Sequence, residues 1–127
     1  YSWYSQLIKP SFAPPSWIFG PVWSVLYIII AVTFIRVFYL SATKVIPGII
    51  VIPFILNLIF NFSFTPLQFG LQNNYLAAID ILLVLGTLIW AIIAIWPYSR
   101  KLAYAQIPYL LWVTFATVLQ LTITWMN

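Results

Sequence analysis

Few residues in this chain could do chemistry, and most of them lie inside long apolar runs. Asp80 is the single acidic residue among 127, and the sequence contains neither histidine nor cysteine. This composition excludes a catalytic triad, an acid–base pair of side chains, a disulfide framework and a thiolate metal site. We therefore expect no metal and no required cofactor. Aromatic rings, a few amides and hydroxyls, and a bound ligand are what remains for chemistry.

Asp80 falls near the start of the third apolar run. A carboxylate at the centre of a membrane span costs roughly 2.5–3.5 kcal/mol on insertion scales. We therefore expect Asp80 to face the interior of a helix bundle or to lie close to the membrane interface. Its carboxylate could contact a ligand or form a hydrogen bond between helices, and both roles remain possible.

Amides and hydroxyls recur at helical spacing in two of the runs. Asn57 and Asn61 are four residues apart, which places them on one helix face, and Thr117 and Gln120 are three apart. Amides that cross between membrane helices stabilise a bundle by about 0.6–2 kcal/mol. Helix–helix bonding and ligand recognition both remain possible for these groups.

Two stripes of large side chains also follow helical spacing: Trp23, Tyr27 and Phe34 in the first run, and Trp112, Ala116, Leu119 and Ile123 in the last. Such stripes are often simple packing. However, Ala116 leaves room beside Trp112, and both Trp23 and Trp112 have a polar tip. Apolar walls with a few polar groups are typical of small-molecule sites, so the stripes favour a flat hydrophobic ligand.

The elements that carry these residues are predicted to cross a membrane. The chain is 65% hydrophobic and 5% charged, against about 25% charged in soluble domains. Its apolar runs cover about 18–40, 45–64, 75–96 and 107–125, each twice the length of a barrel strand. The sequence therefore predicts an all-α polytopic membrane helix bundle, a single transmembrane domain over 1–127 with four visible transmembrane helices. Residues 1–17 form a Pro- and Trp-rich segment outside the membrane.

Proline and the aromatic residues add details on the shape and the ends of the predicted helices. Pro53 lies inside the second run and predicts a kink there. Aromatic residues near the ends of the runs, among them Trp96, Tyr104 and Tyr109, are typical of anchors at the membrane interface.

Positive charge predicts the orientation. Arg36, Lys44, Arg100 and Lys101 lie at or near the first and third connections, whereas the opposite side carries only Lys9. By the positive-inside rule, connections 41–44 and 97–106 face the cytoplasm. The net charge of +4 is too scattered to form a basic patch, so nucleic acid is not an expected partner.

One segment, KPSFAPPSWIFGPVWSVLY from Lys9 to Tyr27, resembles the signature of the translocator protein and tryptophan-rich sensory protein family, also called the peripheral benzodiazepine receptor family. Three later segments are similar to other motifs of that family: LIFNFSFTPLQFG at 58–70, AAIDILLVLG at 77–86 and PYLLWVTFATVL at 108–119. The resemblance covers essentially the whole chain.

The resemblance implies five transmembrane helices, the first of which would precede Tyr1, and we interpret the chain as a fragment of such a protein. It also implies a ligand pocket. With Tyr27 and Asn61 added from the stripe and the amide face, the predicted ligand-binding residues are Phe19, Gly20, Val22, Trp23, Tyr27, Asn61, Ile79, Asp80, Leu83, Trp112, Ala116 and Leu119.

The function implied by the resemblance is an integral membrane receptor or sensory protein that binds tetrapyrroles, such as protoporphyrin IX or haem, and related planar hydrophobic molecules. One alternative is a porphyrin-degrading enzyme that uses Trp23 and Trp112, although we favour a protein that is not an enzyme. Another is a transporter of porphyrin-like or lipid-like molecules. Membrane lipid and a second copy of the chain, as a homodimer, are the expected partners, in a bacterial inner membrane or an organelle membrane.

The resemblance does not extend to cholesterol recognition. The animal motif for cholesterol in the last helix is replaced here by Gln120 and Leu121, and no basic residue follows.

Overall fold

This computed structural model describes residues 18–65 and 74–126, so the predicted lead-in 1–17 lies outside the described residues. Within these ranges the chain forms helices and turns, and no strand. The elements are α2 (Phe19–Ala42), the 3₁₀ turn η2 (Gly48–Ile50), α3 (Val51–Thr65), α4 (Asn74–Ile95), α5 (Arg100–Ala105) and α6 (Ile107–Met126). The prediction of an all-α membrane helix bundle is confirmed.

Three of the described helices are long and apolar enough to cross a membrane: Gly20–Ala42, Tyr75–Ile95 and Arg100–Met126. The apolar helix over Gly48–Phe64 is shorter. With 15 residues, α3 itself is about 22 Å long, less than the roughly 30 Å hydrocarbon core. The buried face of α3 packs against the longer helices of the bundle.

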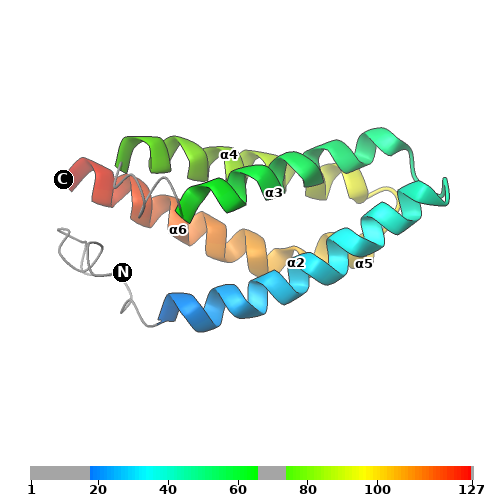
Figure 1. The fold of residues 1–127 in the computed structure, drawn as a ribbon, viewed down its shortest axis with the longest axis horizontal. Coiled ribbons are helices and arrows are strands. Elements are labelled where there is room, and N and C mark those ends of the chain that lie inside the picture. Colours follow the sequence, from blue (N-terminus) through cyan, green and yellow to red (C-terminus); the bar gives the residue numbers. More distant parts are fainter. Residues whose placement is uncertain (1–17, 66–73, 127) are drawn as a thin grey trace.

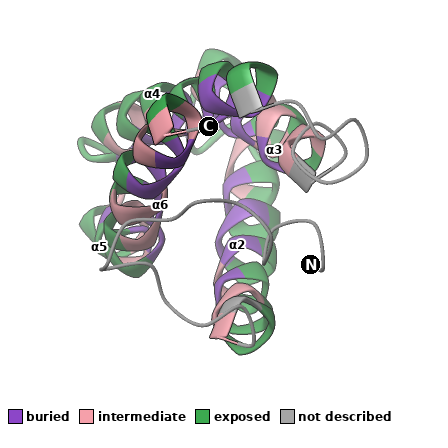
Figure 2. Cartoon of the chain, turned by 90° about the vertical axis from the view of Figure 1, so that its left-hand side faces the viewer, coloured by how far each residue is buried: buried purple, intermediate pink, exposed green. Residues whose placement is uncertain are grey.

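The bundle is a tightly packed set of three helices with α2 laid against it. Helices α3 and α4 pack side by side, and so do α4 and α6, whereas α2 makes its contacts chiefly with α3, η2 and α5. Figure 1 shows the N-terminal end of α2 diverging from α3, while the C-terminal end of α2 approaches the other elements. Seen along the bundle, the buried faces of the helices turn towards its middle (Figure 2).

The close packing of α4 rests on small and branched side chains at helical spacing. Ala77 and Ala91 have no exposed surface, and small residues allow the backbones of membrane helices to approach closely.

On α2, the Phe34 ring meets Phe54 of α3 edge-on, with 4.9 Å between ring centroids. The other buried hydrophobic residues of the central cluster are Leu26, Ile30, Val37, Ile46, Val51, Ile81, Val84, Leu88, Ile95, Ala103, Tyr109 and Val113.

The structure revises two details of the predicted runs. Pro53 does not kink a helix interior, because α3 begins at Val51 and Pro53 lies in its first turn, where a missing N–H costs little. The predicted connection 97–106 contains a short helix, α5, which begins where Ser99 accepts a hydrogen bond from the Leu102 N–H. Gln106 alone then separates α5 from α6, two residues before Pro108.

The first and third connections lie at the same end of the bundle (Figure 1). The four basic residues associated with them, Arg36, Lys44, Arg100 and Lys101, are all exposed. Two of them stack on neighbouring rings: Arg100 lies 5.2 Å from the Trp96 ring centroid, and Arg36 lies 5.4 Å from that of Tyr39. This end therefore carries four exposed cations, two of which lie over aromatic rings.

Lys44 ends α2 in an unusual backbone conformation. Its N–H bonds the Ser41 carbonyl and the next N–H bonds the Leu40 carbonyl, which is a Schellman cap. The capping residue needs a left-handed conformation, and Lys44 has φ of 62°. That conformation costs an L-residue roughly 1–2 kcal/mol, a cost that glycine avoids.

We therefore expect Lys44→Gly to stabilise the bundle by about 1 kcal/mol, measured by thermal unfolding in detergent. Lys44→Ala is the matched control, since it removes the charge and keeps the Cβ. Equal stability of the two variants would show that the backbone conformation at Lys44 carries no cost.

Candidate functional site

A network of polar side chains, most of them buried, connects α2, α3, α4 and α6 at the centre of the bundle. Tyr109 of α6 has no exposed surface, and its hydroxyl donates a hydrogen bond to Asn57 Oδ1 at 2.9 Å. The same hydroxyl accepts a hydrogen bond from Asn61 Nδ2. One phenol on α6 thus holds the two α3 amides whose spacing places them on one face.

Asn57 extends the network to α4. Its Nδ2 donates to the Val84 carbonyl at 3.0 Å and to Thr87 Oγ1 at 3.2 Å. Thr87 in turn donates to the carbonyl of Leu83, one turn back on its own helix. Asn57 is fully buried, so these bonds form in a low-dielectric interior, where an unpaired amide would be costly.

Asn61 extends the network to α2. Its Oδ1 accepts a hydrogen bond from the Tyr27 hydroxyl at 3.3 Å. Both ends of the Asn61 amide are therefore engaged, Oδ1 by α2 and Nδ2 by α6. Asn61 is 5% exposed, whereas Tyr27 is 39% exposed.

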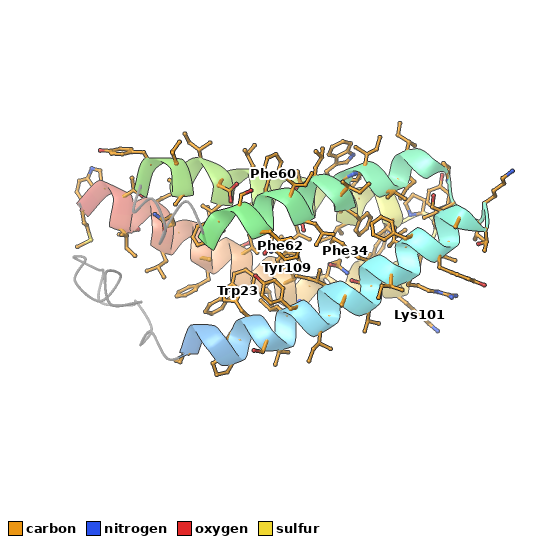
Figure 3. All side chains as sticks on the ribbon, in the orientation of Figure 1. Trp23, Phe34, Phe60, Phe62, Lys101 and Tyr109 are labelled. Atoms are coloured by element: carbon orange, nitrogen blue, oxygen red, sulfur yellow. The ribbon has the colours of Figure 1, made fainter. Side chains whose placement is uncertain are left out.

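Aromatic rings surround this bond where α2 diverges. Tyr27 lies between Trp23 and Phe62, with ring centroids 5.5 Å and 6.1 Å apart respectively. In Figure 3, Trp23, Phe62 and Tyr109 all lie in the region between α2 and the helices beside it. The α2–α3 contact at this level is thus built from rings around one phenol–amide hydrogen bond.

A groove of about 540 Å³ runs between the first turns of α2 and of α6. Its lining is almost entirely apolar and consists of Pro21, Val22, Val25, Leu26, Pro108, Leu111 and Trp112. A volume of this size falls within the range of about 300–1,000 Å³ that is usual for small-molecule sites. Two of the predicted ligand residues, Val22 and Trp112, therefore face one shared space.

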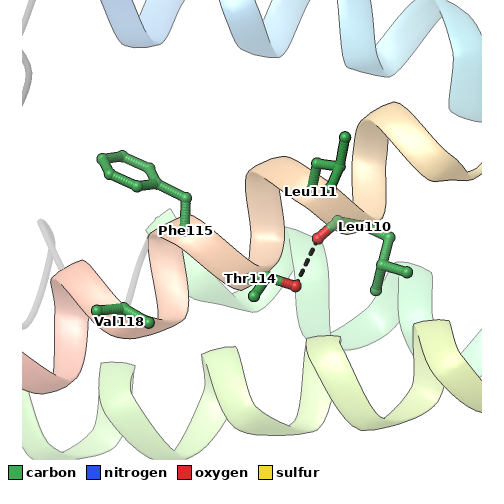
Figure 4. A pocket seen from close by; sticks show the side chains of 5 residues that line it. All are labelled: Leu110, Leu111, Thr114, Phe115 and Val118. Carbon is green, nitrogen blue, oxygen red and sulfur yellow. Dashed lines mark hydrogen bonds between the residues drawn. The ribbon is translucent and has the colours of Figure 1, made fainter.

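A second hollow, of about 530 Å³, lies on α6 and shares Leu111 with the first (Figure 4). It is lined by Leu110, Leu111, Thr114, Phe115 and Val118. The Thr114 hydroxyl is bonded to the Leu110 carbonyl at 2.8 Å, so it presents no spare donor to the hollow. The groove therefore continues along α6 as an apolar surface.

Asp80 lies inside the bundle, as expected from its cost in lipid. It is 4% exposed, and its Oδ2 is buried without a hydrogen-bond partner among the residues the structure describes. Asp80 is one helical turn before Val84, whose carbonyl receives the Asn57 amide. The carboxylate thus continues the polar face of α4.

The other predicted ligand residues are distributed over several faces. Ile79 and Leu83 are exposed on α4, on a different face from buried Asp80. Leu119 is buried, Trp23 and Ala116 are partly buried against the core, and Gly20 is exposed. The side chain of Phe19 lies outside the described part. The structure brings Val22 and Trp112 together in the groove. It also brings Trp23 and Asn61 next to Tyr27. Ile79 and Leu83 lie apart from both groups.

Sequence reasoning missed the central residue of the site. The prediction that Tyr109 is an interfacial anchor is wrong, because the ring is fully buried and its hydroxyl joins two amides. Its spacing from Val113, Thr117 and Gln120 placed it on the polar face of the last run, and this signal could have identified it. Thr117, by contrast, bonds the Val113 carbonyl of its own helix.

Fold and site together define an all-helical integral membrane protein with an apolar groove and a buried network of polar side chains. The chain matches the TspO/MBR family over residues 1–126, and it belongs to that family.

Three relatives illustrate the spread of the family. The tryptophan-rich protein TspO of Bacillus cereus is 38% identical over 126 residues, covering 99% of this chain and 81% of the relative. The human translocator protein is 34% identical over 123 residues, covering 92% and 70%. The tryptophan-rich sensory protein of Cereibacter sphaeroides is 30% identical over 120 residues, covering 91% and 70%.

Proposed function

We propose that this protein is a membrane receptor or sensor that binds a flat, apolar ligand of the tetrapyrrole class, such as protoporphyrin IX or haem. The observation that carries the proposal is the groove between α2 and α6, with Trp112 in its wall and almost purely apolar lining. An indole ring can stack on the face of a planar macrocycle, and aliphatic side chains can cover its edges. The names of the relatives, which include a sensory protein and a translocator protein, agree with this class of function.

Buried polar groups of the bundle would orient the ligand. A porphyrin carries hydrogen-bonding groups on an otherwise apolar plate, and small-molecule sites commonly combine apolar walls with a few placed polar groups. Asn61 and Asp80 are the buried polar side chains that the sequence pattern also selected. In this proposal the rings of Trp23 and Trp112 hold the plate, and the amide and carboxyl groups set its orientation.

The proposal includes a location and a partner. Connections 41–44 and 97–106 face the cytoplasm, because their shared end carries the exposed cations. A second copy packs against lipid-facing surface that includes Gly86, which is exposed and has open space where a Cβ would stand. A small exposed residue in a membrane helix permits close approach by another helix.

The proposal is tested by titrating the protein with protoporphyrin IX in detergent and following tryptophan fluorescence and porphyrin absorbance. We expect saturable quenching in the wild type. We expect weaker binding, by about tenfold, in the Trp23→Phe/Trp112→Phe double variant, because two ring contacts of roughly 0.5–1.5 kcal/mol beyond area burial are reduced.

Trp125→Phe is the matched control for this titration, since Trp125 is 88% exposed near the end of α6. It should bind protoporphyrin IX like the wild type. Quenching without saturation, or the same absorbance titration in the double variant as in the wild type, would refute binding at this site.

A further inference from the structure

The Tyr27 hydroxyl is hydrogen-bonded to the side-chain amide of Asn61, which the proposed ligand would need as a partner. Asn61 Oδ1 accepts from Tyr27 at 3.3 Å, and Asn61 Nδ2 donates to Tyr109. The amide is 5% exposed, so a ligand can reach it only if a covering side chain moves. The site therefore lies closed over its polar group.

The two phenols that hold Asn61 differ in their freedom to move. Tyr109 has no exposed surface and is itself fixed through Asn57. Tyr27 is 39% exposed, and its neighbour Phe62 is 60% exposed, so this side of the amide has open space beside it. Of the two, Tyr27 is the one that can leave without disturbing the core.

The helix that carries Tyr27 is also the most loosely held. Helix α4 packs closely against both α3 and α6, whereas α2 diverges from α3 towards its N-terminal end (Figure 1). A shift of the first turns of α2 would move Val22 and Val25, which line the groove, together with Tyr27. Release of the Tyr27 bond and a change in the width of the groove are therefore mechanically connected.

We infer that Tyr27 is a displaceable plug, an internal competitor that a ligand must remove from Asn61 in order to bind. This inference rests on the proposed function. A protonated ligand carboxyl takes the place of the phenol and donates to Asn61 Oδ1, while the Tyr109 bond to the amide stays intact. Binding then frees the N-terminal half of α2 from its hydrogen bond to α3, which gives ligand occupancy a structural output.

The test is the dissociation constant of protoporphyrin IX for Tyr27→Phe. The variant keeps the ring and removes the competing hydroxyl, so we expect binding about three- to tenfold tighter than in the wild type, the size of one net hydrogen bond. A tyrosine that merely contacts the ligand would give the opposite sign. Tyr104→Phe, at a 60% exposed tyrosine on α5, is the control and should leave the constant unchanged.

A double-variant cycle with Asn61→Ala locates the effect. Without the amide there is nothing for Tyr27 to block, so Tyr27→Phe should give no gain in the Asn61→Ala background. The inference is overturned if Tyr27→Phe binds equally or more weakly, or if its gain persists without Asn61. Absence of saturable binding by the wild type would overturn the proposed function, and this inference with it.

Discussion

Asn57→Ala is expected to destabilise the bundle by about 2–4 kcal/mol, the largest effect of any single polar substitution in the described part of the chain. Asn57 joins α3 to both α4 and α6, through the Val84 carbonyl, Thr87 and Tyr109. Membrane double-variant cycles give about 0.6 kcal/mol for an average hydrogen bond of this kind, with a maximum near 1.7. Three such bonds are lost together, and a cavity is left at a fully buried position. Thermal unfolding in detergent, or unfolding in a denaturing detergent titration, measures the change.

Two further variants distinguish a bonding role from general loss of packing. Ser63→Ala, on the same helix, removes a hydroxyl that bonds the Ile59 carbonyl of its own helix and no other group in the described ranges, and should change stability by less than about 0.5 kcal/mol. Tyr109→Phe keeps the ring and removes the phenol hydroxyl. Its cost and that of Asn57→Ala should be less than additive in the double variant, because they share a bond. Strict additivity would contradict a connected network.

Val22→Trp is expected to weaken ligand binding by at least about tenfold while the protein still folds. Val22 is half-buried and lines the groove opposite Trp112, so an indole at this position would fill the space that the ligand needs. Overfilling a packed space typically costs about 1–3 kcal/mol, and 1.4 kcal/mol is a factor of ten in affinity. The protoporphyrin IX titration measures the effect.

Val32→Trp is the matched control on the same helix. Val32 is 65% exposed and does not line the groove, so a ring there meets lipid and should leave the dissociation constant unchanged. Similar affinities for Val22→Trp and Val32→Trp would show that the ligand binds elsewhere. Loss of binding in both variants would point to a general effect of bulk on α2 and would also contradict a site in the groove.

The secondary structure and its membrane setting followed from the sequence. A chain with so few charges and such long apolar runs has to satisfy its backbone internally, which leaves helices as the solution for runs of this length. Asp80 in the interior and the Asn57–Asn61 face followed in the same way, since spacing and the cost of burying a polar group act locally. Pro53 was misjudged because the start of α3 depends on the 3₁₀ turn before it, which apolar composition does not reveal.

Some properties of the site are determined by the sequence and others by the tertiary structure, and the difference has a physical reason. The sequence determined which residues were available: one acid, a few amides, and tryptophans at helical spacing, within motifs that identify the TspO/MBR family. Only the tertiary structure decided their partners, because a hydrogen bond between Tyr109 and Asn57, 52 residues apart, depends on how α6 packs beside α3 and α4. The same packing turned Ile79 and Leu83 outward and placed Val22 opposite Trp112. Periodicity sets the face of a helix, but the neighbour that this face meets is set by the packing of the whole bundle.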